Sequence, residues 1–257
     1  METREMLRLY DLHERRKASI PGFTRMESPT VLRMVDPTGE FHHIAWSGLD
    51  EESAERAIDA ELEFFAARGE GFEWKLYSHD RPADLKERLA AKGFEIGEDE
   101  AIMALDLAGY AFPEPVLAGF EIRRIRESAA LEDVARISRQ VWGEDQRSFL
   151  EGIAGQLRDS PEYISLYVAY AGGEPVSSAR INFPEGSPFA SLWGGATLEA
   201  WRRRGIYSAL LATRLREAAG RGYAYVTIDA GPMSRPIAEK KGFRLLSTSN
   251  PCSWKPA

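Results

Sequence analysis

A strand followed by an arginine-rich turn and a helix constrains this chain more than any other feature. Residues 189–211 read FASLWGGATLEAWRRRGIYSALL, so an apolar run with paired glycines leads into three arginines and Gly205. Glycines inside a strand often mark a bulge or a close approach by a ligand. A helix N-terminus carries unpaired N–H groups and a partial positive charge, and it therefore attracts anions. We predict a bulged strand and an anion-binding turn that hold an elongated, phosphate-bearing ligand.

The basic run also has a plainer interpretation. Three adjacent charges in a loop often form only a solvated surface. The sequence has no GxxxxGK[ST] pattern, and no GxGxxG pattern lies between a strand and a helix. These absences argue against a nucleoside triphosphatase or a dinucleotide-binding protein, and they leave another phosphate-bearing ligand open.

Charge and composition exclude several kinds of partner. The formal net charge is -7 at pH 7, whereas a general nucleic-acid binder needs a basic face, so we predict no nucleic-acid partner. No apolar run is long enough to cross a bilayer and the first residues are charged, so we predict no membrane contact and a cytoplasmic location. Cys252 is alone, which excludes an internal disulfide and argues against a thiolate-rich metal site. We predict no metal.

The chain is long enough for two modest domains, each with its own core. The segment LAGYAFPEPVLAG at residues 107–119 contains two prolines and two glycines, which interrupt any periodic element. We predict domains at residues 1–115 and 116–257. Strands that first follow one another and then alternate with helices predict the fold class α/β (α+β), with a mixed, mostly antiparallel sheet flanked by helices in each domain.

Hydrophobic periodicity predicts the individual elements. In the first half we expect helices at 3–17, 53–69 and 82–93, and strands at 30–35, 40–49, 72–78 and 100–107. In the second half we expect helices at 128–142, from the arginine turn through 220, and over a short stretch that ends at 241. Its strands are expected at 120–125, 163–170, 174–183, 189–198 and 223–229, followed by a terminal strand pair from 243 onward. The segment around 149–159 has no element assigned.

The two halves share a weak internal repeat. HDRPADLKERLAAKGF at residues 79–94 and IDAGPMSRPIAEKKGF at residues 228–243 carry Asp, Lys, Gly and Phe at the same offsets, which suggests duplication of one fold. In the first half, however, Asp50, Glu51 and Glu52 connect the strand to its helix. Carboxylates there favour the helix N-terminus and repel phosphate, so we predict that only the second half binds an anion.

The arginine turn resembles the phosphate-binding motif of the GNAT superfamily of N-acetyltransferases. Members carry [QR]-x-x-G-x-[GA] between the fourth strand and the third helix, and this chain has RRRGIY at residues 202–207. The resemblance also includes YVTID and KKGF near the end of the chain, and it covers residues 119–257. It implies a tandem GNAT-like protein with a degenerate N-terminal copy, and acetyl-CoA as co-substrate. Tyr207 departs from the motif, because the family usually has Gly or Ala there.

The resemblance assigns residues to the acetyl-CoA site position by position. On the strand, Gly195, Ala196 and Thr197 would pair with the pantetheine arm. A backbone N–H near Thr197 would polarise the thioester carbonyl. At the turn, the pyrophosphate would be held by Arg202, Arg203, Arg204, Gly205, Ile206, Tyr207 and Ser208.

The implied reaction is direct attack of a primary amine on the acetyl thioester. The tyrosine that commonly protonates the leaving thiolate corresponds here to Ala238, so the usual general acid is missing. Tyr207 could donate the proton, Asp229 could act as base or orient the amine, and Ser234 is a third candidate. The alternatives are packing for Tyr207, a turn or cap for Asp229 and a helix cap for Ser234.

The acceptor is predicted only as a class, a small-molecule or peptide amine. Glu144, Asp145 and Glu199 could attract a cationic amine, although most exposed carboxylates have no such role. Two other functions fit the sequence: a non-catalytic acyl-CoA-binding sensor, and an acyltransferase for another acyl-CoA or a hydroxyl acceptor. The N-terminal domain would cover the acceptor cleft or provide a homodimer surface.

Overall fold

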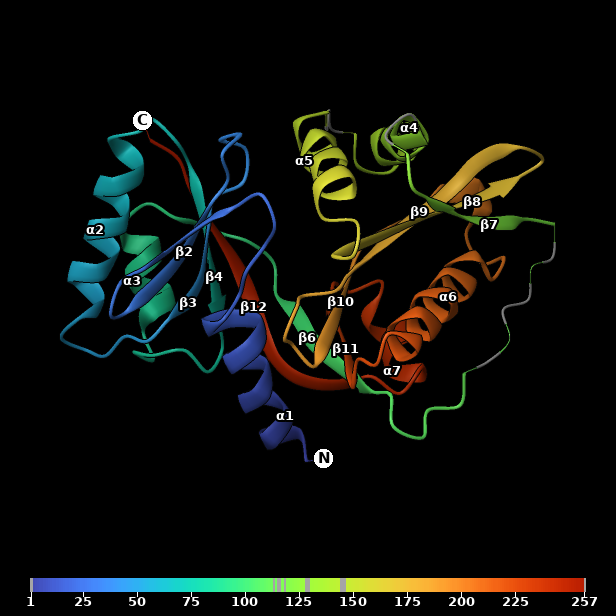
Figure 1. Cartoon of the computed structure of the whole chain (residues 1–257). Coiled ribbons are helices and arrows are strands. Elements are labelled where there is room, and N and C mark those ends of the chain that lie inside the picture. Colours follow the sequence, from blue (N-terminus) through green and yellow to red (C-terminus); the bar gives the residue numbers. More distant parts are fainter. Residues whose placement is uncertain are drawn as a thin grey trace. The chain divides into compact units, whose positions relative to one another are not determined.

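The computed structural model describes residues 2–256 except 113, 115, 116, 118, 128, 129 and 144–146. The chain forms two compact units (Figure 1). The first unit contains the residues up to Ala104 together with those from Asp229 onward, and the second contains Leu105–Ile228. The N-terminal and C-terminal parts of the chain therefore fold into the same unit.

The first unit is built on a sheet with the strand order β1-β2-β3-β4-β12-β6. The strands are β1 (Thr24–Glu27), β2 (Val31–Val35), β3 (His43–Ser47), β4 (Phe72–Tyr77), β6 (Glu100–Asp106) and β12 (Arg244–Trp254), with the short β5 (Glu95–Ile96) beside β12. Only β3 and β4 run parallel among these described pairs. The C-terminal strand thus completes a sheet that begins near the N-terminus.

Helices pack on this sheet, and alternate side chains of a strand belong to different core clusters. The helical elements are α1 (Thr3–Tyr10), a π-helical turn (Asp11–Arg16), α2 (Ala54–Ala66), α3 (Leu85–Ala91) and α7 (Arg235–Lys240). Ile58 and Phe65 of α2 and Leu89 of α3 pack with Trp74 of β4 in one core cluster. Leu32 and Met34 belong to a separate cluster, because successive strand residues alternate between the faces of a sheet.

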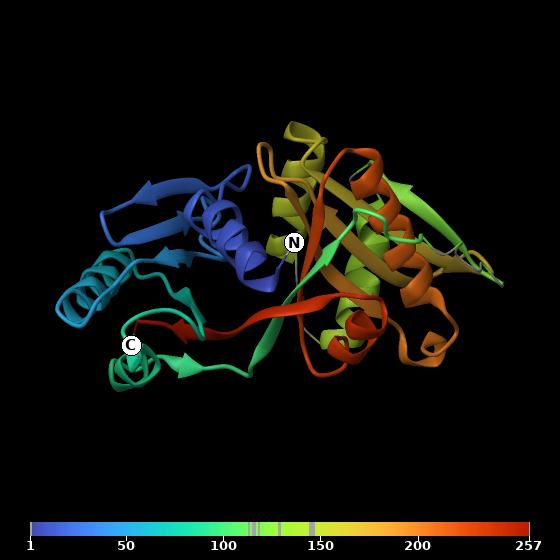
Figure 2. The ribbon, with the colours of Figure 1, turned by 90° about the horizontal axis from the view of Figure 1, so that it is seen from below.

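In the second unit the strands follow the order β11-β10-β9-β8-β7. Its elements are β7 (Glu121–Ile125), α4 (Leu131–Trp142), α5 (Arg147–Asp159), β8 (Ile164–Ala171), β9 (Glu174–Asn182), β10 (Phe189–Thr197), a 3₁₀ turn (Glu199–Trp201), α6 (Ile206–Gly220) and β11 (Tyr225–Ala230). Leu166 and Val168 pack with α4 and α5, whereas Tyr167 donates a hydrogen bond to Glu217 of α6. The helices therefore cover both faces of this sheet, as Figure 2 shows.

The predicted fold class, α/β (α+β) with mixed, mostly antiparallel sheets flanked by helices, is confirmed. Three details differ from the sequence-based expectation. The predicted terminal strand pair is wrong, because Arg244–Trp254 form one long strand with an irregularity between Leu245 and Ser247. Residues 147–159 form the helix α5, and β1 is a strand that the periodicity did not indicate, since all four of its residues are exposed.

The compact units also differ from the expected boundary near residue 115. β12 pairs with β4 over Ser249–Trp254 and with β6 over Arg244–Ser249, so the end of the chain groups with the first unit. A boundary read from proline and glycine content marks a linker in the sequence, but it cannot show which sheet a distant strand joins. The assignment of domains to residues 1–115 and 116–257 stays a prediction.

Candidate active site

The strands β10 and β11 run parallel and then stop pairing partway along β10. Their register runs from Phe189 opposite Tyr225 to Leu192 opposite Ile228, although β10 continues to Thr197. On its other edge β10 pairs with β9 as far as Thr197. The last part of β10 therefore has one edge where its described residues do not pair with β11, and such an edge can pair with an extended ligand.

A β-bulge lies in this unpaired part of the strand. The β9–β10 register shifts between Trp193 and Ala196, and Gly194 has a φ of 59°. A positive φ strains a residue with a side chain, which explains a glycine at this point. Trp193, Gly194 and Gly195 are exposed, although β10 begins with buried residues. The paired glycines of the sequence thus form the bulge that they predicted.

Hydrogen bonds fix the orientation of Thr197 at the end of β10. The Ser177 hydroxyl donates to the Ala196 carbonyl at 2.6 Å, and the Leu198 N–H donates to the Val176 carbonyl at 3.0 Å. Because backbone groups of successive strand residues point to opposite edges, the N–H and C=O of Thr197 point away from β9. The Arg202 Nε donates to the Thr197 carbonyl at 3.2 Å. The Thr197 N–H therefore faces the unpaired edge of β10.

The turn after β10 has a backbone suited to binding an anion. Gly205 precedes α6 and has a φ of 82°, and Arg203 has a φ of 62°. No other non-glycine residue in the described part of the chain has a positive φ. Left-handed residues at such a turn can direct successive N–H groups into one concave surface. None of the amides from Arg203 to Ser208 donates a backbone hydrogen bond within the described structure. These amides and the α6 N-terminus could hold a phosphate.

The three arginines of the turn are arranged differently from one another. Arg202 binds the Thr197 carbonyl, and the Arg204 guanidinium lies 4.5 Å from the centre of the Trp201 ring. All three are exposed. Arg202 and Arg204 thus order the turn as well as add positive charge, a structural role that the basic run alone did not indicate.

Tyr207 in the first turn of α6 lies against the bulge. An ideal Cβ on Gly195 would be 3.5 Å from Cε2 of the Tyr207 ring, so the ring covers this glycine. Burial raises the pKa of the Tyr207 phenol, and Arg214 partly opposes this shift. The phenol therefore stays protonated at neutral pH, and a phenolate base is excluded there.

Asp229 and Ser234, the other predicted catalytic residues, belong to the first unit. Asp229 forms a buried ion pair with Lys75 of β4, and this carboxylate raises the pKa of the Lys75 ammonium despite its burial. The Ser234 hydroxyl donates to the Gly231 carbonyl at 3.2 Å, so it closes a turn and makes no side-chain cap on α7. Ala238 is buried in α7. Asp229 and Ser234 are therefore both engaged in contacts with a structural role.

Only one of the three predicted acceptor-binding carboxylates, Glu199, lies in the described part of the chain. Glu199 begins the 3₁₀ turn after β10 and is exposed. Glu144 and Asp145 lie outside the described residues.

The first unit presents a different helix start at the corresponding place. Before α2, the Asp50 carboxylate accepts hydrogen bonds from the Ser53 N–H at 2.8 Å and from the Ser53 hydroxyl at 2.6 Å. The carboxylate thus occupies the position that an external anion would need. That the first half does not bind phosphate stays a prediction, and this turn gives it a physical basis.

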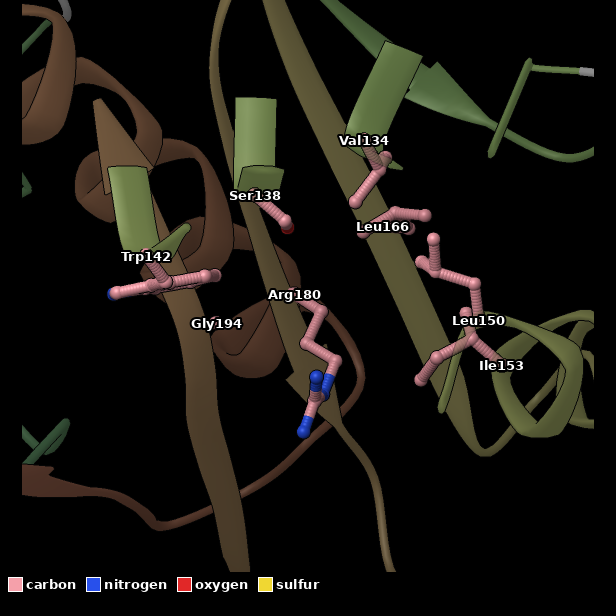
Figure 3. Close-up of a pocket in the computed structure, with 8 residues that line it drawn as sticks. All are labelled: Val134, Ser138, Trp142, Leu150, Ile153, Leu166, Arg180 and Gly194. Atoms are coloured by element: carbon pink, nitrogen blue, oxygen red, sulfur yellow. The ribbon is translucent and has the colours of Figure 1, made fainter. Parts of the chain in front are cut away.

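A small pocket that the sequence did not reveal opens beside the bulge (Figure 3). Its lining residues come from α4, α5 and three strands: Val134, Ser138, Trp142, Leu150, Ile153, Leu166, Arg180 and Gly194. Arg180 is the one charged residue in VSSARIN at residues 176–182, and this single charge was the available signal. Gly194 connects the pocket to the bulge of β10.

These features fit a pantetheine-linked pyrophosphate. A bulged strand with one unpaired edge suits an extended amide-bearing arm, and the turn with its unbonded amides suits phosphates. At Gly205 an added Cβ would meet no atom within 4 Å, so the space above this residue is open to a ligand. No group of three or more potential metal-ligating side chains occurs among the residues that the structure describes.

The bulged strand and the left-handed turn before α6 are the structural features that the resemblance to GNAT proteins implied. Residues 128–243 match the model of the acetyltransferase (GNAT) family. Over these residues the chain therefore matches the GNAT family, as its motif indicated. No curated protein sequence matches the chain.

Solved structures share the fold over most of the chain. A GCN5-related N-acetyltransferase from Kribbella flavida is 16% identical with a TM-score of 0.72, and the match covers 99% of this chain and 96% of that one. A conserved protein of unknown function from Staphylococcus epidermidis is 14% identical with a TM-score of 0.69, covering 94% and 97%. A tandem GNAT protein from the clavulanic acid biosynthesis pathway is 12% identical with a TM-score of 0.62, covering 93% and 85%. In the described part of this chain, the helices are too short or too polar to cross a membrane.

Proposed function

We propose that this protein transfers an acetyl group from acetyl-CoA to a primary amine. The observation that carries the proposal is the combination of the bulged, partly unpaired β10 with the left-handed turn before α6. Membership of residues 128–243 in the acetyltransferase family supports the same activity.

Acetyl-CoA would supply the thioester whose carbonyl carbon the amine attacks. Gly195, Ala196 and Thr197 would bind the pantetheine arm, and the amides from Arg203 to Ser208 would bind the pyrophosphate. The Thr197 N–H, directed to the unpaired edge, would donate to the carbonyl oxygen as negative charge develops there. The neutral amine would form the C–N bond as the C–S bond breaks, without a covalent enzyme intermediate. Coenzyme A would leave as the thiolate, and the proton lost by the amine nitrogen would be taken up by this thiolate, directly or through water.

Tyr207 is the best placed of the three candidate catalytic residues. Its ring covers Gly195, and its phenol stays protonated because burial raises its pKa. A phenol of raised pKa is a weak acid, so its contribution would be a hydrogen bond to the developing thiolate sulfur. Asp229 and Ser234 are weaker candidates because Lys75 and Gly231 already engage them.

The first half would serve as a non-binding partner domain. The Asp50–Ser53 turn excludes phosphate from its helix start, and the structural likeness to a tandem GNAT protein supports two related domains at residues 1–115 and 116–257. A role as cover for the acceptor cleft or as a homodimer surface belongs to this proposal. The predicted cytoplasmic location and the absence of nucleic-acid and membrane partners are likewise proposals.

Release of coenzyme A thiol from acetyl-CoA across a panel of amines tests the activity. We expect amine-dependent release, with the acetylated amine identified by mass. An acyl-CoA sensor is the second candidate, favoured by the buried Ala238 at the usual tyrosine position. Saturable acetyl-CoA binding without turnover of any amine would support the sensor, and faster turnover with another acyl-CoA or an alcohol would change the substrate assignment.

A further inference from the structure

Arg214, in the middle of α6, is a buried cation. It is 2% exposed, and burial lowers the pKa of its guanidinium to about 10. At neutral pH the side chain is therefore charged, although the charge lies away from water. Burying a charge is costly unless its surroundings offset the cost, so the groups around Arg214 indicate what the charge does.

The hydrogen-bond partners of Arg214 are carbonyl groups. Its Nε donates to the Leu210 carbonyl at 3.2 Å, and its Nη1 donates to the Arg180 carbonyl of β9 at 3.0 Å. Among the residues that the structure describes, no carboxylate contacts the guanidinium. The groups that interact with its charge are the phenols of Tyr207 and Tyr167. Two carbonyls thus fix the guanidinium, and no acid neutralises its charge.

The two phenols near Arg214 differ in their hydrogen bonds. The Tyr167 hydroxyl donates to the Glu217 carboxylate at 2.7 Å, so this phenol already has an acceptor. The Tyr207 hydroxyl makes no hydrogen bond to another residue in the described part of the chain. Burial raises the pKa of the Tyr207 phenol, and Arg214 partly opposes this shift. Tyr207 is therefore the phenol that can donate a hydrogen bond to a ligand.

The fold brings Arg214 and Tyr207 to one side of α6, next to the bulge of β10. They are seven positions apart, nearly two helical turns, so both side chains lie on the same face of the helix. Arg214 reaches β9 at the Arg180 carbonyl, and Arg180 pairs with Trp193 at the start of the bulge. The Tyr207 ring covers Gly195 of the bulge through Cε2, the atom next to the carbon that carries the hydroxyl. The guanidinium and the hydroxyl end of the ring therefore lie at the same bulge.

We propose that Arg214 is a positioning residue for acyl transfer, which strengthens the hydrogen bond from Tyr207 to the leaving thiolate. The inference rests on the proposed acetyltransferase function and deepens it, because Arg214 acts through Tyr207 and does not touch the substrate. A fixed positive charge beside a phenol polarises its O–H bond and makes the hydroxyl a better donor. The hydrogen bond would strengthen as the C–S bond breaks and negative charge develops on sulfur. Arg214 keeps its proton throughout.

The first experiment measures the effect of Arg214 on the phenol without ligand or turnover. 3,5-Difluorotyrosine is incorporated at position 207 of the full chain, and its fluorine chemical shift is followed by NMR against pH. This phenol is more acidic than that of tyrosine, so it ionises at a lower pH, where Arg214 still carries its proton. Arg214→Gln removes the charge and keeps a donor for the Arg180 carbonyl, whereas Arg214→Lys keeps the charge.

We expect the midpoint of this titration to rise by about one pH unit in Arg214→Gln and to change little in Arg214→Lys. Arg216→Gln is the matched control, because Arg216 lies on the opposite face of α6 from Tyr207 and pairs with Glu114. Its midpoint should equal that of the wild type. Arg214→Met serves as a second neutral variant if Arg214→Gln does not fold. Equal midpoints in the wild type and a folded neutral variant would overturn the proposal.

A double-mutant cycle with Tyr207→Phe then tests the role in turnover. We expect Arg214→Gln to lower kcat with an amine acceptor about tenfold and to leave the KM for acetyl-CoA nearly unchanged. In the Tyr207→Phe background the same substitution should change kcat by less than about twofold, because the hydroxyl on which Arg214 acts is absent. Equal losses in the two backgrounds would mean that Arg214 only supports the fold, and they would also overturn the proposal.

Failure of this proposal is distinct from failure of the proposed function. Calorimetric binding of acetyl-CoA and amine-dependent release of thiol by the wild type report the acetyltransferase function itself. When the wild type turns over, the titration and the double-mutant cycle decide the role of Arg214. A wild type that releases no thiol with any amine rejects the acetyltransferase function, and it rejects a role for Arg214 in acyl transfer whatever the titration shows.

Discussion

Gly205 tests the phosphate-binding turn at a single residue. Its φ of 82° suits glycine, and an added side chain would meet no atom within 4 Å. We predict that Gly205→Asp weakens acetyl-CoA binding by about 100-fold or more, because a carboxylate would face the phosphates. Calorimetric titration with acetyl-CoA measures the loss.

Gly205→Asn is the matched control for this substitution. Asparagine has nearly the size of aspartate and tolerates a left-handed backbone, but it has no charge. We expect this variant to retain most of the affinity and both variants to stay folded. Equal losses in the two variants would show that backbone strain or bulk matters there and that charge does not.

Tyr207→Phe tests the role of the phenol. The substitution keeps the ring that covers Gly195 and removes only the hydroxyl. We predict that kcat falls about 10-fold to 100-fold while acetyl-CoA affinity changes little, because the hydroxyl would act on the leaving sulfur. Steady-state kinetics and calorimetry measure the two quantities. An unchanged kcat would leave Tyr207 with packing as its role.

At the scale of single residues, the sequence predicted the backbone features of the site better than the roles of its side chains. Gly194 and Gly205 have left-handed conformations that only glycine adopts easily, so the bulge and the turn were predictable. Arg180 was not, because the pocket depends on α4 and α5 packing over β8 and β9, which no local pattern records. The ion pair of Asp229 was not predictable either, since its partner Lys75 lies 154 positions away in the sequence.

Among the elements, α2 carries a buried carboxylate that links stability to pH. Glu61 lies 3.0 Å from Arg33, and its side chain is only 3% exposed. Burial outweighs the attraction of Arg33 and raises the pKa of Glu61 to about 7. Because the folded state then binds this proton more tightly than the unfolded state, the Glu61 contribution to stability is lost as pH rises from 4.5 to about 7.

We therefore predict that Glu61→Gln gains stability relative to the wild type over this interval. The difference in free energy of unfolding between variant and wild type should rise by about 1 to 3 kcal/mol from pH 4.5 to pH 8. Urea unfolding at several pH values measures it, with the exposed Glu63→Gln on the same helix as control. A difference that stays constant with pH would contradict the raised pKa.

The periodic elements were predictable because their signal is local. α2, α4, α6 and most strands agree with the expected segments, since each has an apolar face or a buried run. β1 has no buried residue and so gives no periodic signal. β12 was expected as two strands, yet pairing with β4 keeps the chain extended through Asn250 and Pro251.

At the scale of the whole molecule, the C-terminal strand completes the sheet of the first unit. Cys252 of β12 pairs with Trp74 of β4 and is fully buried in the same core cluster. Burial raises the pKa of its thiol to about 12. We predict that Cys252 reacts with a thiol reagent at pH 8 at least about 100-fold more slowly in the native protein than in urea.

Mass spectrometry of timed labelling measures these two rates. The single cysteine makes the result specific for β12. Rapid labelling of the native protein would mean that β12 does not form part of the first unit. Slow labelling would support a fold in which the end of the chain is required for the stability of its beginning.

Thermal unfolding with and without acetyl-CoA tests the central claim, that the second unit holds this ligand, most directly. ATP and NAD are the controls, because they also carry phosphates and adenine but have no pantetheine arm. At about a hundred times its dissociation constant, acetyl-CoA should stabilise the protein by about 2.7 kcal/mol and raise the unfolding midpoint by roughly 5 to 10 °C. A rise with acetyl-CoA alone is the predicted result. No rise, together with no heat of binding in calorimetry, would contradict the acetyl-CoA site and the function built on it.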